Sequence, residues 1–160
     1  MTRFADKILK RDALLARAAA WRESKATIAL ANGCFDILHV GHLRYLQAAA
    51  ALADHLIVAV NSDASTRQLK GPGRPILPQR ARAELVAALR CAAAVIIFDE
   101  LTVEPLLRAL HPDFHAKGTD YTAASVPEAD VAEQLGVGIR IVGDPKIHAT
   151  RDLLARIRQT

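Results

Sequence analysis

The chain has 160 residues, of which 51% are hydrophobic and 24% charged, and it carries a formal net charge of +4 with a pI near 9.4. This length fits one domain with a sizeable core over residues 1–160, with residues 1–25 as an N-terminal helical extension, and leaves no room for a second catalytic domain. The positive charge favours anionic ligands, but the charges are scattered and only 4% of residues are aromatic, which argues against a nucleic-acid partner.

Cysteine usage and hydropathy indicate a cytoplasmic protein. Cys34 and Cys91 are the two cysteines and form no pairing motif, as is typical of reduced thiols. The start of the sequence lacks the long apolar stretch of a secretion signal, and no run of about 18 apolar residues suits a membrane span. We therefore expect no membrane partner.

The first predicted element is a helix over residues 11–22. Apolar residues recur there along one stripe, and Asp12 near the start suits the helix dipole. Trp21 belongs to this stripe. Its indole could stack on a ligand, but packing in the core or in an interface is the simpler role.

A strand, a glycine-bearing loop and a helix follow. Residues 27–31 form a short apolar run, residues 32–42 form the loop, and the alanine-rich segment 43–53 holds strong helix formers without Gly or Pro. A loop that enters a helix N-terminus presents unpaired backbone N–H groups and the positive end of the helix dipole. An anion is therefore the expected guest.

Two glycines and two histidines of this loop suit such a guest. Gly33 and Gly41 allow the backbone to approach closely, while His39 and His42, three residues apart, can point the same way. Imidazoles at this place would donate hydrogen bonds to oxygens that gain charge during phosphoryl or nucleotidyl transfer. A metal site, helix capping and ordinary packing stay open as alternatives.

The next predicted strand, residues 55–60, completes a βαβ unit. A right-handed crossover then brings Gly33 and Asn61 to the same edge of the sheet. Ser62 and Asp63 can cap a following turn of helix.

A loop rich in Gly and Pro, residues 70–75, precedes a predicted helix over residues 78–89. The loop is either a solvated surface turn or a lid whose Lys70 and Arg74 reach a triphosphate. Further strands are predicted over residues 94–98, 114–117 and 138–142, and further helices over residues 103–110 and 128–135 and at the C-terminus. The alternation of strands and helices indicates an α/β fold.

Residues 33–42 read Gly-x-Phe-Asp-x-Leu-His-x-Gly-His, which resembles the signature of the cytidylyltransferase-like nucleotidyltransferases. That superfamily joins a nucleoside triphosphate to a phosphorylated small molecule. Within it, the chain most resembles the adenylyltransferase domain that makes ADP-heptose from a heptose 1-phosphate, from about Lys7 to the C-terminus. The resemblance implies a Rossmann-like three-layer α/β sandwich with a five-stranded parallel sheet and an HxGH nucleotidyltransferase site.

Matches further along the chain imply more site residues. Lys70 and Arg74 match the family's Lys-Gly-x-Gly-Arg-Pro loop, and Arg82 matches an arginine that faces the nucleotide phosphates. Lys117 and Asp120 match Lys-Gly-x-Asp-Tyr, which implies a place in the nucleotide or sugar-phosphate pocket. From the residues alone, a surface ion pair would explain these two equally well.

The last motif departs from the family. Relatives show Ser-Thr-Thr at the start of the terminal helix, where this chain has Ala149-Thr150-Arg151. Thr150 stays a candidate contact to the nucleotide, while His148 is more simply a capping or solvent-facing residue.

The resemblance implies that a phosphate oxygen of a sugar 1-phosphate attacks the α-phosphorus of ATP and releases pyrophosphate, with Mg²⁺ bridging the phosphates. No protein residue is assigned as a metal ligand, and Asp36 is expected to hydrogen-bond its own loop. The expected catalytic residues are His39, His42, Lys70 and Arg82. The expected nucleotide-binding residues are Asn32, Gly33, Cys34, Phe35, Asp36, Gly41, Asn61, Lys117, Gly118, Asp120 and Thr150, and the expected substrate contacts are Arg74 and Tyr121.

The expected partners are ATP, a sugar 1-phosphate and a separate sugar kinase upstream, because the resembled domain is often fused to a kinase that this length does not accommodate. Self-association into a homo-oligomer stays open. Three other hypotheses remain. The same fold could use CTP with an alcohol phosphate such as glycerol 3-phosphate, it could make a flavin nucleotide, or it could bind nucleotides without catalysis.

Overall fold

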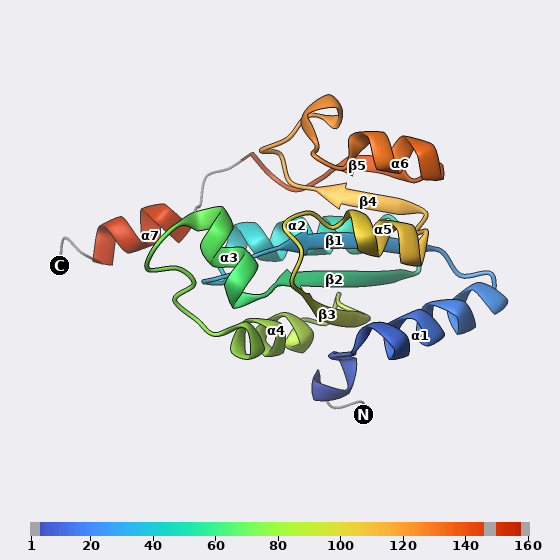
Figure 1. Ribbon diagram of the computed structural model, residues 1–160, viewed down its shortest axis with the longest axis horizontal. Coiled ribbons are helices and arrows are strands. Elements are labelled where there is room, and N and C mark those ends of the chain that lie inside the picture. The colour runs from blue at the N-terminus through green and yellow to red at the C-terminus, as the bar shows by residue number, and fades with distance from the viewer. Residues whose placement is uncertain (1–3, 146–149, 158–160) are drawn as a thin grey trace.

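A sheet of five parallel strands forms the centre of the computed structural model, which describes residues 4–145 and 150–157 (Figure 1). The strands are β1 (Ile28–Gly33), β2 (His55–Asn61), β3 (Ala94–Phe98), β4 (Phe114–Lys117) and β5 (Gly138–Ile141). Their order in space is β3-β2-β1-β4-β5, so β1 lies in the middle. The predicted α/β fold with a five-stranded parallel sheet is confirmed.

Helices cover both faces of the sheet and so make three layers. One face packs against α1 (Arg11–Glu23), α5 (Glu104–Leu110) and α6 (Ala129–Leu135), and the other against α2 (Val40–Ala50) and α4 (Gln79–Ala88). The other helical segments are the 3₁₀ turns η1 (Phe4–Lys7) and η2 (Ala123–Ser125) and the helices α3 (Asp63–Lys70) and α7 (Thr150–Ile157). Figure 1 shows α3 and α7 on the side of the strands' carboxyl ends and α1 toward their amino ends. Among the described helices, none is both long and apolar enough to cross a membrane.

The strands read as apolar runs because both faces of the sheet are covered. Leu30 pairs with Ile57 in the β1–β2 register, and both belong to the core under α1, α5 and α6. The next pair, Ala31 and Val58, belongs to the core under α2 and α4. Successive side chains of a strand point to opposite faces, so each central strand contributes to both cores.

The predicted elements agree with the structure to within three residues at their ends, and β3 and β4 have the predicted bounds. α2 begins at Val40, three residues before the predicted start, so the end of the glycine-bearing motif is already helical. α3 is a full helix where a turn was predicted, and the Ser62 hydroxyl accepts a hydrogen bond from the Ser65 N–H as its predicted cap. The turns η1 and η2 were not predicted.

The strand order reverses beside β1, and this reversal opens a crevice. The chain leaves β1 through α2 toward β2 on one side, while β4 pairs with β1 on the other side after the chain has passed through α5. These connections run on opposite faces of the sheet. The carboxyl ends of β1 and β4 therefore lie open between them, at the position where open α/β sheets bind ligands.

Candidate functional site

A cleft of about 830 Å³ lies at the carboxyl ends of the strands. Most of the sequence-predicted site residues line it, namely Asn32, Gly33, Cys34, Phe35, Asp36, His39, Gly41, His42, Asn61, Lys70, Arg74, Lys117, Gly118, Asp120 and Tyr121. The structure thus brings together residues that four separate segments of the sequence supply. Among the predicted site residues whose side chains the structure describes, Arg82 lies outside this lining.

The loop after β1 is shaped by one aromatic ring. Phe35 is buried and has a φ of 47°, in the left-handed region that side chains with a Cβ rarely adopt. Its ring lies under Gly33, where an added Cβ would come within 3.1 Å of the ring carbons. A glycine at position 33 therefore leaves room for the ring that supports the floor of the cleft.

His39 and His42 form a pair at the start of α2. Their rings stack with centroids 3.8 Å apart and an interplanar angle of 24°, and the Phe35 ring meets His42 edge-on at 5.4 Å. His39 is the extended residue before the helix, and its side chain makes no capping hydrogen bond. Both imidazoles line the cleft beside the helix N-terminus, as the three-residue spacing predicted. This end of the cleft can offer several N–H donors to an anion.

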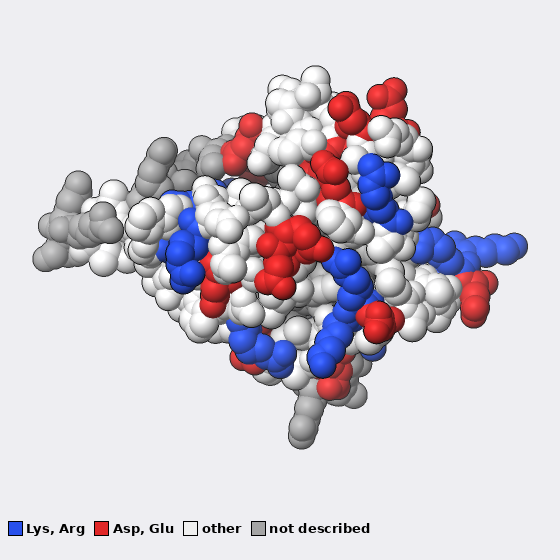
Figure 2. Space-filling view, in the orientation of Figure 1, with Lys and Arg blue, Asp and Glu red and all other residues white. Residues whose placement is uncertain are grey.

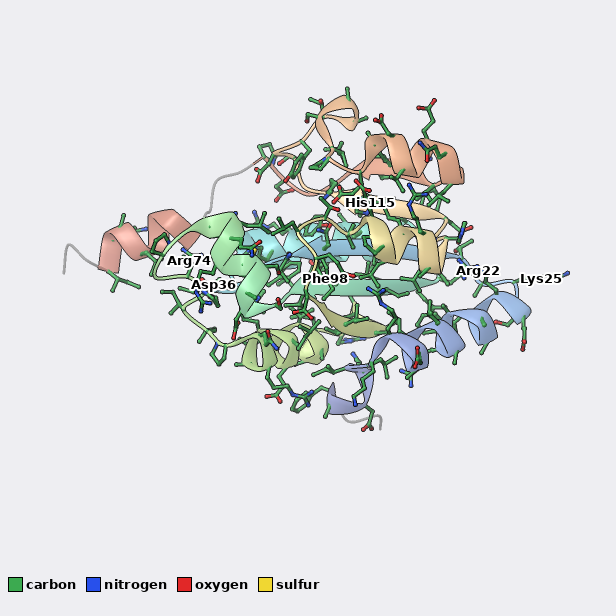
Figure 3. The ribbon with its side chains drawn as sticks, in the orientation of Figure 1. Arg22, Lys25, Asp36, Arg74, Phe98 and His115 are labelled. Atoms are coloured by element: carbon green, nitrogen blue, oxygen red, sulfur yellow. The ribbon has the colours of Figure 1, made fainter. Side chains whose placement is uncertain are left out.

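The side chain of Asp36 fixes the loop that follows α3 through hydrogen bonds. Its buried carboxylate accepts hydrogen bonds from Arg74 Nε at 2.6 Å, from the Ile76 N–H at 2.8 Å and from the Leu77 N–H at 3.0 Å. Figure 3 shows Asp36 and Arg74 lying next to each other at this loop. The expectation that Asp36 bonds its own loop is therefore corrected. It bonds a loop about 40 residues away, because Arg74 and two unpaired N–H groups face it.

Arg82 lies beneath the cleft rather than on its surface. Its side chain is fully buried and donates hydrogen bonds to the carbonyl oxygens of Cys34, Asn61 and Leu77, and to Asp63 Oδ1 at 2.8 Å. The guanidinium thereby joins the ends of β1 and β2 to the starts of α3 and α4. The sequence match placed Arg82 facing the phosphates, whereas in the structure it holds the segments that form the cleft.

Lys117, at the end of β4, is buried in a pair that the sequence did not suggest. Its Nζ lies 3.0 Å from Asn32 Oδ1, 3.0 Å from Glu128 Oε2 and 5.2 Å from the centre of the Tyr121 ring. The alternative of a surface ion pair between Lys117 and Asp120 is corrected, since Lys117 is only 5% exposed and pairs with Glu128.

Glu128 and His115 were missed because sequence position gives no sign of their contact. Glu128 stands just before α6, where an acidic residue is ordinary helix-start chemistry, and His115 sits inside a short strand. In the structure, His115 Nε2 lies 3.5 Å from Glu128 Oε2. Burial of Glu128 by itself would raise the pKa of its carboxyl group, but His115 and the Lys117 charge together lower that pKa to about 2.

Two more polar contacts border the β4–β5 end of the cleft. Arg44 on α2 pairs with Asp144 at 2.9 Å, and the Thr119 hydroxyl donates to the Asp144 carbonyl oxygen at 2.8 Å. The first contact holds the segment after β5 against α2, and the second holds it against the loop after β4. Burial raises the pKa of Tyr45, whose hydroxyl donates to the Ala116 carbonyl oxygen at 2.8 Å.

The cleft also carries an exposed cation. Lys70 ends α3 and lines the cleft, and in the described part of the chain no carboxylate pairs with it. Charges of both signs are interspersed on the face in Figure 2. The described residues hold no group of three or more His, Cys, Asp or Glu side chains that could bind a metal ion.

The terminal motif is described only in part. His148 and Ala149 lie outside the described residues. Thr150 begins α7, but its side chain and that of Arg151 lie outside the described part, so the predicted contact of Thr150 with a nucleotide stays a prediction.

Comparison with known proteins agrees with this architecture. The Cytidylyltransferase-like family model matches residues 30–144. The chain is 41% identical over 157 residues to the bifunctional protein HldE of Mesorhizobium japonicum, covering 98% of this chain and 32% of that protein. It is 44% identical over 149 residues to the bifunctional protein HldE of Hyphomonas neptunium, covering 93% and 31%. The chain thus spans about a third of the length of these curated relatives.

A solved structure has a similar fold. It is the crystal structure of the lipopolysaccharide core biosynthesis protein from Thermoplasma volcanium, which superposes with a TM-score of 0.64 at 27% sequence identity. The superposition covers 75% of this chain and 99% of that one.

Proposed function

The chain belongs to the cytidylyltransferase-like family, and from this premise we propose that it is a nucleotidyltransferase that transfers AMP from ATP to a heptose 1-phosphate, giving ADP-heptose and pyrophosphate. One observation carries the proposal: the stacked His39–His42 pair faces a cleft at the start of α2, where the strand order reverses. We propose a heptose 1-phosphate as the acceptor because the sequence resembles the domain that makes ADP-heptose. Similarity to the bifunctional HldE proteins over nearly the whole chain supports that choice.

The proposed reaction forms a bond between a phosphate oxygen of the heptose 1-phosphate and the α-phosphorus of ATP. The bond from the α-phosphorus to the oxygen that bridges it to the β-phosphorus breaks, and pyrophosphate leaves with that oxygen. Such a transfer needs positioning and charge stabilisation more than a protein nucleophile. His39 and His42 would donate hydrogen bonds to the oxygens that gain charge, and the N-terminus of α2 would add its dipole.

We infer the roles of the other cleft residues from their positions in the cleft. Lys70 is the exposed cation at the mouth and would bind the β- and γ-phosphates. Arg74 and Tyr121 would contact the sugar phosphate. Asp36 and Arg82 would act as positioning residues, since their polar atoms already bind the backbone of the cleft. The remaining proposed nucleotide contacts are Asn32, Gly33, Cys34, Phe35, Gly41, Asn61, Lys117, Gly118, Asp120 and Thr150.

Mg²⁺ would enter with the triphosphate rather than occupy a site built by the protein. The buried carboxylate of Asp36 already binds Arg74 and two backbone N–H groups, and the carboxylate of Glu128 already pairs with Lys117. Asp144 pairs with Arg44. The ion would neutralise phosphate charge in solution and in the complex, so the described residues do not need to ligate it.

Two wider proposals follow from the same chemistry. We propose that a sugar kinase acts upstream of this reaction, because the acceptor must already carry a phosphate group before it can attack ATP. We also propose that the reaction takes place in the cytoplasm, where ATP is available.

A product assay tests the proposal. The protein is incubated with Mg²⁺ and either ATP or CTP, together with a heptose 1-phosphate, glycerol 3-phosphate or flavin mononucleotide, and the products are identified by mass. We expect ADP-heptose and pyrophosphate from ATP and the heptose phosphate only. A CDP-alcohol or a flavin dinucleotide would replace the proposed acceptor, and binding of ATP without any product would contradict catalysis.

A further inference from the structure

Four polar side chains form a line from the core to the floor of the cleft. His115, labelled in Figure 3, is fully buried on β4. Its Nδ1 lies 3.3 Å from the Leu30 carbonyl oxygen, and its Nε2 lies 3.5 Å from Glu128 Oε2. The same carboxylate oxygen lies 3.0 Å from Lys117 Nζ. Lys117 in turn donates to Asn32 Oδ1 at 3.0 Å. Three of these residues, Asn32, Lys117 and Glu128, line the cleft.

Protein stability alone does not explain the buried ion pair of Lys117 and Glu128. Glu128 is 2% exposed and Lys117 is 5% exposed. Removal of two charges from water to this depth offsets most of what their attraction contributes, and apolar side chains of similar size often give equal or greater stability. A role at the cleft accounts for the pair better.

The hydrogen-bonding capacity of Lys117 shows what that role requires. An ammonium group has three N–H donors and no acceptor. The described residues give it two oxygen acceptors, on Asn32 and Glu128, and the Tyr121 ring lies 5.2 Å away, so one N–H donor has no oxygen acceptor among them. Because Lys117 can only donate, it also turns the oxygen of the Asn32 amide toward itself and the NH₂ group away from itself. The pair therefore sets the direction of N–H donors from two side chains.

We propose that Glu128 is a positioning residue for nucleotide binding, whose carboxylate holds Lys117 and, through it, Asn32, so that both aim N–H donors at the phosphate oxygens of a bound nucleoside triphosphate. Asn32 stands one residue before Gly33 at the end of β1, next to the loop that carries His39. The inference rests on the proposed function, because it takes the nucleotide as the ligand.

Glu128 acts on the ligand only through Lys117 in this arrangement, and a double-mutant cycle tests that dependence. Glu128→Gln keeps the size of the side chain and a carbonyl oxygen for the Val103 N–H, which Glu128 Oε1 accepts at 3.3 Å, but it removes the charge. Lys117→Met removes the donor and keeps an extended side chain. The double variant removes both charges together, so no buried charge is left without its partner.

Binding of MgATP is measured by calorimetry for the wild type, both single variants and the double variant, with thermal unfolding of each as a check of folding. We expect Glu128→Gln to weaken binding about tenfold, as is usual when a hydrogen bond to a charged group is lost. The double variant should bind no more weakly than Lys117→Met alone. As a matched control, Glu133→Gln removes the same charge from an exposed position on α6 and should bind as the wild type does.

Folded Glu128→Gln protein that binds MgATP within about twofold of the wild type would overturn the inference. Losses that add in the double variant would overturn it too, because Glu128 would then act independently of Lys117. If Glu128→Gln does not fold, Lys117→Met and the double variant still test the inference. Weaker binding of MgATP by the double variant than by Lys117→Met would then overturn it. Wild-type protein that binds no ATP would overturn the proposed function as well, so the wild-type titration separates the two failures.

Discussion

The two sides of the cleft are held by different kinds of contact. On the side of β1 and β2, charged side chains hold backbone: the Asp36 carboxylate accepts two N–H groups, and the Arg82 guanidinium donates to three carbonyl oxygens. On the side of β4, side chains hold one another, in the line of His115, Glu128 and Lys117. The first arrangement fixes the path of loops, and the second fixes the direction of individual donors.

This difference separates two tasks in binding an anion. Asp36 and Arg82 shape the β1 side from below, whereas the two imidazoles and Lys70 line the cleft at its surface. The β4 side holds a neutralised ion pair, so it adds oriented hydrogen bonds but little net charge. Attraction of a triphosphate should therefore come mainly from the β1 side, and its exact placement from both.

The largest effect is expected when the support of the β1 side is removed. Arg82→Met leaves three carbonyl oxygens and the Asp63 carboxylate without their donor, and we expect a loss of about 3–5 kcal/mol in the free energy of unfolding, as for other broken buried charge networks. Urea unfolding measures it. Arg80→Met on the same helix removes an exposed ion pair with Glu84 and should cost less than about 1 kcal/mol. Equal losses in both variants would show that the buried contacts of Arg82 are not a support.

Acid should remove the contribution of the Glu128 carboxylate, on the β4 side of the cleft, to the free energy of unfolding. The pKa of Glu128 is about 2 in the folded chain and 4.5 in its ordinary state, so the unfolded chain takes up the proton first as the pH falls. The stability that this carboxylate contributes is complete above about pH 5 and is lost as the pH falls toward 2, on the order of 3 kcal/mol. The measurement compares the free energy of unfolding at pH 7 and pH 3 for the wild type and Glu128→Gln. The same acid loss in both would contradict the assignment to Glu128.

Loss of one imidazole tests the surface of the β1 side without disturbing its support. His39→Ala or His42→Ala should lower kcat about 100-fold, the usual loss of one preorganised donor, or about 2.7 kcal/mol in the barrier. Steady-state pyrophosphate release gives kcat, and thermal unfolding controls for the lost stacking. Near-normal turnover in both variants would remove these rings from the mechanism.

The smallest effect is expected at Lys70. It is exposed, so water screens its charge, and Lys70→Ala should raise KM for ATP roughly threefold to tenfold with little change in kcat. Lys25→Ala, a change of the same charge far from the cleft, is the matched control. If KM stays unchanged, the loop after α3 is a surface turn and the charge balance between the two sides of the cleft must be revised.

The β1 side could be predicted because its residues are contiguous in the sequence. Gly33, His39 and His42 fall within ten residues, where a strand passes into a helix and the apolar patterns of both are plain. Five strands in alternation with helices then set the fold, and parallel pairing set the edge where the cleft opens. The short turns η1 and η2 lack such a pattern, which is why they were not predicted.

The β4 side could be predicted only in part because its contacts join distant residues. Lys117 was found by its motif, but its partner Glu128 is eleven positions further along and its other partner Asn32 is 85 positions back. The position of Arg82 could not be predicted from the sequence for the same reason. A motif indicates that an arginine belongs near the phosphates, but whether it reaches the surface or supports it from below depends on which carbonyl groups the folded loops leave unpaired.

A crystal structure with an ATP analogue whose α–β bridge resists cleavage tests the central claim most directly. We predict that the α-phosphate lies within hydrogen-bonding distance of His39 and His42 at the start of α2, with the terminal phosphates toward Lys70. A nucleotide bound at the amino-terminal edge of the sheet, or imidazoles turned away from the phosphates, would contradict it.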